Sequence, residues 1–431
     1  MLDRFLSRPW VQRWLPVACL IGAAVYGYVI AFLRVARFRD FDVHREVGRR
    51  FLTGEYLYAG GYCHPYMPAA AMYFAPLAWF DRATGMALRY AIAVAALCLT
   101  FALLHRMVRA RLEAAGREGF TLAALTVLLA FPFILQDLDD GGPHLILLAM
   151  LTGGIYAVWR GREGTGALWF GLATALKVTP ALFLPLFLWK RQWRLAGLTA
   201  AAALFWIALP MVWMGAGSWW SHQKEWIEVA AGSFVGRDRP VTVENEQRVR
   251  NQSLRLALTR YLTILPEDHP LRRDDPAYVP MLDLSLPAAK TAATVAMAGL
   301  LALLGWHARR PYGGPGDPAW PKECSLVLIL ALLFSPVTWV QHLVWLVPAL
   351  YLIVADARSG GGLGRPAWAA LGAYVVLVDL LNYELLGKPK FAVLLSYHPF
   401  TVAMLLLFAI LLADRPRTNA ISLSANRHAV I

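Results

Sequence analysis

Charged residues are scarce in this sequence. Only 16% of the 431 residues are charged, whereas 58% are hydrophobic. One soluble core of this length cannot enclose so much apolar surface, so the composition excludes an ordinary soluble globular protein. A membrane-spanning helix needs about 20 mainly apolar residues, and segments of this kind recur from residue 15 to residue 413. We therefore expect an all-α polytopic membrane protein.

Cysteine is also rare. The four cysteines, Cys19, Cys63, Cys98 and Cys324, show no CxxC spacing and no histidine in metal-binding register. This pattern predicts neither a disulfide framework nor a zinc site. No motif indicates a cofactor. The chemistry of the protein is therefore expected to rest on its own side chains.

The basic residues indicate how the chain crosses the membrane. They give a net charge of +13 and lie in short clusters between the apolar segments, not on one domain face, which is typical of topology signals and not of nucleic-acid binding. With both termini in the cytoplasm, ten full spans place these clusters inside. The predicted spans are 15–33, 85–105, 119–135, 143–159, 195–215, 286–306, 321–336, 338–355, 366–383 and 393–413.

Two further apolar stretches do not fit a full span. Residues 66–80 carry two prolines and are too short, and residues 167–189 are interrupted by Lys177, Pro180 and Pro185. Both are predicted to be broken or re-entrant, which points to a site because such backbone at membrane depth is either buried in protein or lines a cavity. We expect one transmembrane domain over 1–431, with outer loops at 34–65 and 217–285.

Acidic residues gather in two outer segments. Asp40 and Asp42 follow the first span, where partial desolvation makes a carboxylate a better general base; solvated acids paired with neighbouring arginines are the alternative. Asp137, Asp139 and Asp140 precede a Gly-Gly-Pro turn. Their spacing fits a bound hard cation and a polar hairpin turn equally well.

Other polar residues interrupt apolar surroundings. Lys177 lies inside a broken helix, so it indicates a functional site unless its amine reaches the cytoplasmic surface. A basic and amide-rich run in the large outer loop suits a phosphate or is solvated charge; its members are Arg248, Arg250, Asn251, Gln252 and Arg255. Gln341 and His342 lie where two spans meet at the outer face, and His342 is either a site residue or a packing residue.

Several short motifs follow one another along the chain. They are Asp40-Phe41 with Val43, Gly54 to Tyr58, Tyr66 to Pro68 with Pro76 to Ala78, Leu176 to Pro180 with Trp189 to Arg191, Asn251 to Leu254, Ser335-Pro336, Trp339 and His342 to Trp345. In this order they resemble the GT-C superfamily of membrane glycosyltransferases, and most closely glycosyltransferase family 87, the polyprenyl-phosphate-mannose-dependent α-mannosyltransferases. The family often has two tyrosines at His44-Arg45 and a Gly-Gln-x-Asn turn at 141–144, so His44 and His144 are expected to face the sugars.

The resemblance implies a GT-C-like bundle that moves a hexose, in this family mannose, from a polyprenyl phosphate to a hydroxyl of a lipid or glycan. Transfer is expected with inversion, without a metal, at the outer face of a bacterial cytoplasmic membrane. Asp40 matches the family's presumed base, with His342 orienting acceptor or phosphate. The arginines of the large loop and Lys177 are expected to hold the phosphate. The other predicted substrate contacts are Asp42, His44, Asp139, Asp140, His144, Asn251, Gln252 and Gln341.

A transporter or flippase of lipid-linked sugar is the main alternative, because it also has broken helices and charged residues at membrane depth. Repeat symmetry between the two halves is expected of many such proteins. Both broken stretches, however, lie in the first half of this chain. A non-catalytic membrane scaffold gives no reason for grouping Asp40, Asp139, Arg250 and His342 on one face. The sequence therefore favours an enzyme.

Overall fold

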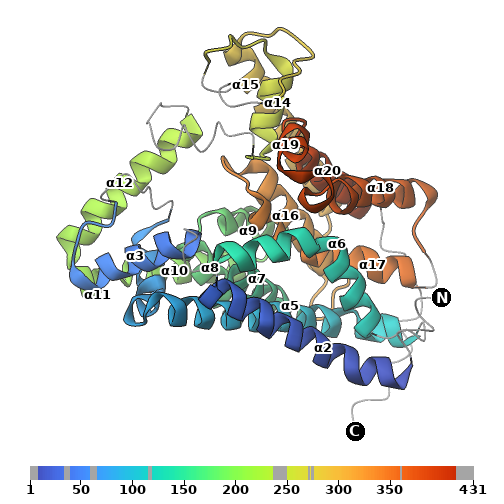
Figure 1. The fold of residues 1–431 in the computed structure, drawn as a ribbon, viewed down its shortest axis with the longest axis horizontal. Helices are drawn as coiled ribbons and strands as arrows, with labels where there is room; N and C mark the ends of the chain where they lie inside the picture. The colour runs from blue at the N-terminus through green and yellow to red at the C-terminus, as the bar shows by residue number, and fades with distance from the viewer. Residues whose placement is uncertain are drawn as a thin grey trace.

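The computed structural model describes residues 8–33, 39–58, 66–114, 119–235, 250–269, 272, 276–359 and 362–413. Within these residues every regular element is a helix, and no strand occurs (Figure 1). The expected all-α architecture is confirmed. The longer helices are α2 (Pro9–Tyr28), α5 (Arg82–Ala114), α6 (Gly119–Asp140), α7 (His144–Trp159), α8 (Glu163–Leu176), α10 (Trp193–Ala208), α12 (Ala216–Val235), α15 (Leu286–His307), α16 (Trp320–Phe334), α17 (Val347–Arg358), α18 (Arg365–Val375), α19 (Tyr383–Leu395) and α20 (Pro399–Ala413).

Apolar composition and length identify the clearest membrane spans. Among the described residues, five helices qualify, and the bent pair Arg365–Leu380 and Leu385–Leu395 is a sixth if counted as one span. The five are Arg82–Glu113, Phe120–Asp140, Trp193–Met214, Leu286–His307 and Val340–Arg358. A polytopic membrane protein is thus supported, while the predicted count of ten is not confirmed.

Shorter helices account for the difference in count. The 16 residues of α7 extend roughly 24 Å at 1.5 Å per residue, less than the roughly 30 Å of a hydrocarbon core. In α16, every residue from Trp320 to Leu333 is buried. Helices surrounded by other helices need not match the bilayer by themselves, because protein covers their ends. Periodicity and length along the sequence do not reveal this environment.

The stretch 167–189 is two helical pieces, as predicted. The first piece, α8, ends at Leu176, Lys177 is extended, and the chain resumes as η3 (Thr179–Leu182) and α9 (Phe183–Trp189). Pro180 at the start of η3 cannot donate a helical hydrogen bond, which explains the break. An ion pair of 3.9 Å joins Arg194, in the first turn of α10 directly after α9, to Glu163 at the start of α8. Both ends of this hairpin therefore lie at the same end of the bundle.

The stretch 66–80 is short and broken, also as predicted. It forms α4 (Pro68–Phe74) and η2 (Ala75–Trp79), packed against α3 (Asp40–Thr53). Gly48 of α3 allows this close approach, because a Cβ there would lie 2.5 Å from the carbonyl oxygen of Phe74. The first outer segment is thereby fixed to the bundle.

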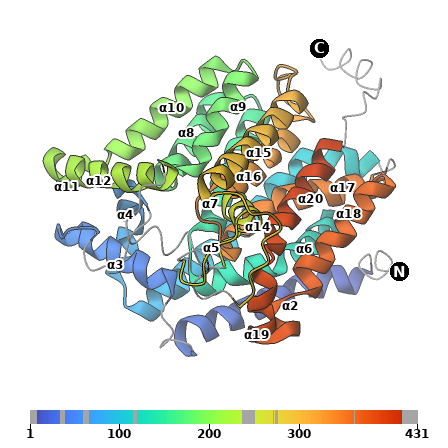
Figure 2. The ribbon, with the colours of Figure 1, turned by 90° about the horizontal axis from the view of Figure 1, so that it is seen from above.

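The two ends of the bundle have different polar contacts. At one end Arg82 at the start of α5 pairs with Asp42 of α3. At the other, Arg111 near the end of α5 pairs with Asp356, which also binds Lys322 at 2.8 Å. From Arg82 to Arg111 the helix rises roughly 44 Å at 1.5 Å per residue, about the full thickness of a bilayer. Helices α3, α4, α11 (Met211–Met214) and α12 group on one side, away from α17, α18 and α20 (Figures 1 and 2).

Candidate functional site

A buried polar cluster lies where α3 meets the middle of the bundle. It consists of Asp40, Arg89, Asp137, His144, Lys177 and His342, and we refer to it as the polar cluster. These residues come from the start of α3, from α5, from the end of α6, from the start of α7, from the break after α8, and from η4 (Val340–Leu346). Residues 40 and 342, far apart in the sequence, are thus brought to one place by the fold.

Asp40 is held at the first turn of α3. The side chain of Asp42 accepts a hydrogen bond of 2.8 Å from the backbone N–H of Arg39, which starts the helix at Asp40. Gln341 Nε2 of η4 donates to Asp40 Oδ2 at 3.2 Å. Burial raises the pKa of Asp40 above its ordinary value, and the hydrogen bond from Gln341 and the charges of Arg89 and Lys177 oppose that rise. A carboxylate with a raised pKa is a more effective proton acceptor.

Asp42 anchors α3. Its Oδ1 lies 2.5 Å from Arg82 Nε and its Oδ2 lies 2.7 Å from Arg82 Nη2, a bidentate pair, and Oδ2 also caps the helix. One of the two predictions for the acids after the first span was that they pair with arginines. Asp42 does pair with an arginine, but that arginine is Arg82 and not Arg39 or Arg45. Arg45 instead donates to the carbonyl oxygen of Phe80 at 2.8 Å.

Arg89 and Asp137 form a buried ion pair. Their Nη2 and Oδ2 atoms are 3.1 Å apart, and their side chains are 4% and 0% exposed. Asp137 also accepts hydrogen bonds of 3.3 Å from the backbone N–H groups of His144 and Leu145, and so caps α7. In the described part of the chain, Nε and Nη1 of Arg89 are buried without a hydrogen-bond acceptor. This leaves donor capacity in the cluster for a bound anion.

Arg89 is a site residue that the sequence reasoning missed. It lies inside the apolar segment 85–105, for which the sequence predicts a membrane span and no site residue. An ionisable residue within such a segment is itself a signal of function, because its charge is costly to place in lipid. The same signal identified Lys177, which interrupts its helix visibly, whereas Arg89 lies within an unbroken one.

Two histidines of the polar cluster lie side by side. The rings of His144 and His342 are 4.3 Å apart at an angle of 58°, and both are buried. The backbone N–H of Trp339 donates to Nδ1 of His342 at 3.3 Å. The accepting Nδ1 carries no proton, so in the neutral ring the hydrogen is on Nε2. His342 therefore offers an N–H donor at the site.

His44 packs beside the cluster as an aromatic ring. It stacks on Phe74 with ring centroids 4.2 Å apart, and burial is the main reason that its pKa falls to about 3. The ring is neutral at physiological pH. Gly141 brings the α6–α7 turn against this part of α3: its φ is +76°, and a Cβ would lie 2.6 Å from that of Phe41.

Lys177 turns into the bundle. Its Nζ lies 5.7 Å from the centre of the Trp345 ring, and its charge acts on the carboxylate of Asp40. A small cavity of about 10 Å³, roughly the space of one water molecule, is lined by Lys177, Thr179, Ser335, His342 and Trp345. The amine of Lys177 therefore does not reach the cytoplasmic surface, which was the alternative that the sequence left open.

The predicted amides of the large outer loop have internal partners. Asn251 accepts from the backbone N–H of Thr338 at 2.9 Å and donates to the carbonyl of Pro336 at 2.8 Å. Gln252 donates to the carbonyl of Leu395 and accepts from the N–H of Phe400. Both side chains are fully buried. They hold the 335–339 junction, which in turn positions Gln341 and His342.

The arginines predicted for phosphate contact do not lie in the polar cluster as far as the structure describes them. Arg250 is exposed just before Asn251, and Arg255 is in the first turn of α14 (Leu254–Leu262). Arg248 lies outside the described residues. The cluster instead contains Arg89 and Lys177.

The three acids at the C-terminal end of α6 take separate partners. Asp137 pairs with Arg89, Asp139 lies 3.7 Å from Arg39, and Asp140 accepts from Gln136 at 2.5 Å. Across the described ranges, no three His, Cys, Asp or Glu side chains are grouped as a metal site would require. The sequence fitted a bound cation and a polar hairpin equally well, and the observed contacts fit the polar hairpin.

Comparison with known proteins adds to this geometry. Residues 64–336 match the profile described as Glycosyltransferase family 87. A "Polyprenol-phosphate-mannose-dependent alpha-(1-2)-phosphatidylinositol mannoside mannosyltransferase" of Mycolicibacterium smegmatis is 28% identical over 369 residues, covering 77% of this chain and 75% of the relative. The protein of the same description from Mycobacterium tuberculosis is 27% identical over 80% of this chain and 76% of its own.

A third relative differs in the acceptor that its description names. It is a "Polyprenol-phosphate-mannose-dependent alpha-(1-2)-phosphatidylinositol pentamannoside mannosyltransferase" of Mycolicibacterium smegmatis, 27% identical over 58% of this chain and 50% of its own. No solved structure matches the chain.

Proposed function

Because the chain belongs to glycosyltransferase family 87, we propose that this membrane glycosyltransferase moves mannose from a polyprenyl phosphate to a hydroxyl group of a lipid-linked acceptor. The observation that carries the proposal is the environment of Asp40. Its partly buried carboxylate accepts a hydrogen bond from Gln341 and is subject to the positive charges of Arg89 and Lys177. A base and a cationic pocket are what transfer from a sugar phosphate needs.

Asp40 is the general base in this mechanism. It takes the proton of the acceptor hydroxyl as the acceptor oxygen bonds to the anomeric carbon of the sugar. The bond between that carbon and the phosphate oxygen breaks, and its electron pair leaves with the polyprenyl phosphate. A single displacement of this kind inverts the anomeric configuration. Gln341 orients the carboxylate through its hydrogen bond.

The leaving phosphate gains negative charge as the bond breaks. Arg89, Lys177 and the Nε2–H of His342 are the donors that we assign to it, since all three belong to the polar cluster. Fixed donors aimed at developing charge are worth more in a water-poor site than in solution. The ion pair with Asp137 holds the Arg89 guanidinium in place before the donor binds.

We place the polar cluster at the outer face of the membrane. The opposite end of the bundle carries Arg111, Lys190 and Lys322, and cytoplasmic ends are enriched in such residues. The broken helix between α8 and α9 reaches from that end to the cluster, which gives the donor a path beside irregular backbone.

The test is transfer by the purified wild-type protein in nanodiscs. Radiolabelled polyprenyl-phosphate mannose, polyprenyl-phosphate glucose and a nucleotide-linked mannose are offered with a synthetic alkyl mannoside acceptor. Label is expected in the product only from polyprenyl-phosphate mannose, and NMR of the product is expected to show inversion. Transfer from the nucleotide sugar alone, or retention of configuration, would contradict the proposal.

A further inference from the structure

A second recess lies at the far end of α3. Its volume is about 280 Å³, just below the usual range for small-ligand sites. The side chains that line it include Arg50, Thr53, Glu55, Trp213, Met214 and Ser218. It is therefore formed by the end of α3 on one side and by α11 and the start of α12 on the other. No residue of the polar cluster lines it.

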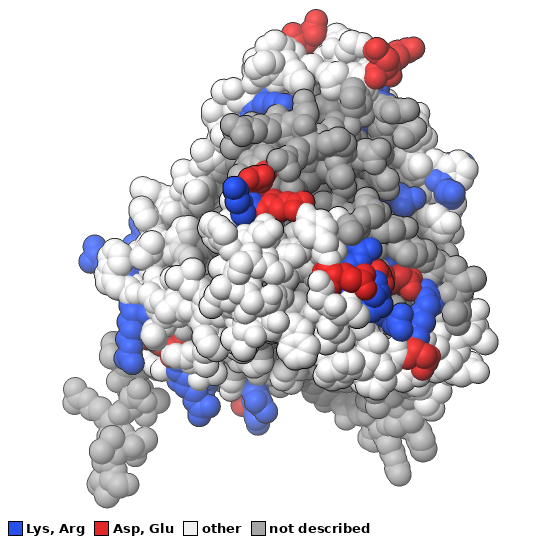
Figure 3. Space-filling view, turned by 90° about the vertical axis from the view of Figure 1, so that its left-hand side faces the viewer, with Lys and Arg blue, Asp and Glu red and all other residues white. Residues whose placement is uncertain are grey.

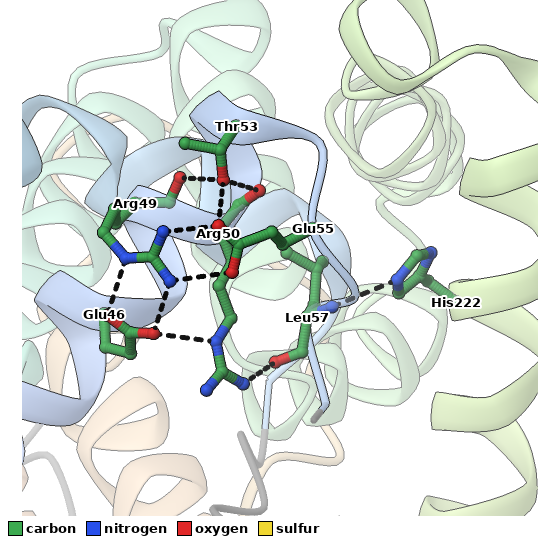
Figure 4. Close-up of polar contacts among 7 residues, drawn as sticks. All are labelled: Glu46, Arg49, Arg50, Thr53, Glu55, Leu57 and His222. Carbon is green, nitrogen blue, oxygen red and sulfur yellow. Dashed lines mark hydrogen bonds and ion pairs between the residues drawn. The ribbon is translucent and has the colours of Figure 1, made fainter. Parts of the chain in front are cut away.

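Polar contacts fix the two walls of this recess to each other (Figure 4). The backbone N–H of Leu57 donates to Nε2 of His222 at 3.2 Å, and Nδ1–H of His222 donates to the carbonyl oxygen of Ser218 at 2.8 Å. With one nitrogen accepting and the other donating, the ring is the neutral Nδ1–H tautomer. The indole N–H of Trp213 donates to the carbonyl of Phe51 at 3.2 Å. The recess is built into the fold.

Charges at the recess are balanced. Arg49 pairs with Glu46 at 2.8 Å and with Glu55 at 2.5 Å, and Arg50 pairs with Glu46 at 2.9 Å (Figure 4). Two acids thus neutralise two bases. Figure 3, which shows the side carrying α3 and α12, likewise has acidic and basic side chains next to one another in small patches within a largely uncharged face. A phosphate site has a surplus of donors and positive charge, so this recess favours a neutral ligand.

We propose that the recess binds a neutral sugar of the acceptor, several units away from the hydroxyl that reacts at Asp40. The indole of Trp213 is 63% exposed while its N–H is bonded, so its ring offers an apolar surface for a sugar ring. Thr53, Glu55 and Ser218 supply oxygens, and Arg50 supplies N–H donors, for the hydroxyl groups of a sugar. Aromatic surface with a few convergent polar groups is typical of small-ligand sites.

The position of the recess determines which acceptors it contacts. Asp40 is at the first residue of the 14-residue α3, and the recess is at its last turn. At 1.5 Å per residue the two are roughly 20 Å apart, farther than a single sugar reaches. An acceptor with an extended glycan therefore contacts both, and a short acceptor contacts only the polar cluster. This inference rests on the proposed function and assigns it a preference for acceptors with long glycans.

The experiment compares two synthetic acceptors, octyl α-mannoside and octyl α-mannopentaoside, in steady-state transfer from polyprenyl-phosphate mannose. Trp213→Ala removes the aromatic surface, and Ser218→Tyr fills the recess without removing an interaction of the helices. Trp220→Ala is the matched control, since Trp220 is also exposed, at 56%, lies in α12 and does not line the recess.

For the pentamannoside, KM is expected to rise roughly tenfold in both recess variants, the loss of about one aromatic contact. KM for the monomannoside and both kcat values are expected to stay near wild type, as is every parameter of Trp220→Ala. Equal KM changes for the two acceptors, or none, would overturn the recess assignment while transfer by the wild type continued. Absence of any wild-type transfer would instead remove the proposed function, and the recess assignment with it.

Discussion

The buried pair of Arg89 and Asp137 allows structural and catalytic roles to be separated. Removing one partner of a buried ion pair costs about 3–5 kcal/mol, because it leaves an uncompensated charge. Arg89→Met leaves Asp137 with two backbone N–H donors, from His144 and Leu145, so we expect the lower end of that range. Asp137→Leu leaves the guanidinium without its carboxylate and removes the cap of α7, so we expect the upper end.

A double-mutant cycle measures the coupling of this pair. The variant with both substitutions is expected to be less destabilised than the sum of the two single variants, by roughly 0.5–3 kcal/mol. The free energy of unfolding is measured in bicelles by denaturant titration. Additive effects would contradict the assigned ion pair.

Activity of the folded fraction then tests the role of Arg89. Lys190→Met is the matched control, because Lys190 and Glu323 form a buried pair of 2.7 Å, 1% and 3% exposed, at the other end of the bundle. Both variants are expected to lose stability. Only Arg89→Met is expected to lose about 10²- to 10³-fold in kcat per folded molecule, the usual effect of removing a donor to developing charge. Wild-type kcat in folded Arg89→Met would refute the assignment to the leaving phosphate.

Three further outcomes follow from the site. The kcat/KM of transfer is expected to rise with pH through the raised pKa of Asp40, because the base must be ionised. Gln341→Leu removes a hydrogen bond that lowers this pKa, so the rise in kcat/KM of this variant is expected at higher pH than in the wild type. A rise at the same pH in both proteins would exclude the contact. Asn251→Ala leaves the N–H of Thr338 and the carbonyl of Pro336 without their partner, at a cost of about 1–3 kcal/mol for each buried group, and this is measured as a lower free energy of unfolding; an unchanged free energy would contradict these contacts. Incubation with a chelator is expected to leave transfer unchanged, since Asp137, Asp139 and Asp140 have separate partners; loss of transfer that added Mg²⁺ or Mn²⁺ restored would contradict this.

Local chemistry in the sequence was sufficient for several features. Prolines and a lysine in an apolar stretch predicted the helix break at Lys177. The acids directly after a span predicted a partly desolvated carboxylate at Asp40. These conclusions depend on a few adjacent residues and on the cost of polar groups in lipid. The predicted topology placed Asp40 and Gln341 at the same face of the membrane, and the fold supplies the hydrogen bond between them and brings the charge of Lys177 to act on Asp40.

Roles that depend on distant partners were not readable from the sequence. Asn251 and Gln252 were expected to contact substrate, but both side chains form hydrogen bonds with residues more than 80 positions away. Asp40 and Asp42 are two positions apart in the sequence, yet Asp40 accepts a hydrogen bond from Gln341 whereas Asp42 forms an ion pair with Arg82. The number of spans was not readable either, since the burial of α16 depends on which helices surround it.

The identity of the base is the central claim, and Asp40→Asn tests it most directly. Transfer from radiolabelled polyprenyl-phosphate mannose is measured for the wild type, for Asp40→Asn and for Asp42→Asn, whose carboxylate anchors α3 through Arg82. Because burial raises the pKa of Asp40, its ionisation in the folded protein costs stability at neutral pH, so the Asn variant is expected to be at least as stable as the wild type. We predict that Asp40→Asn lowers kcat by about 10²- to 10⁴-fold, while Asp42→Asn changes stability more than kcat. Wild-type transfer by well-folded Asp40→Asn would contradict the account.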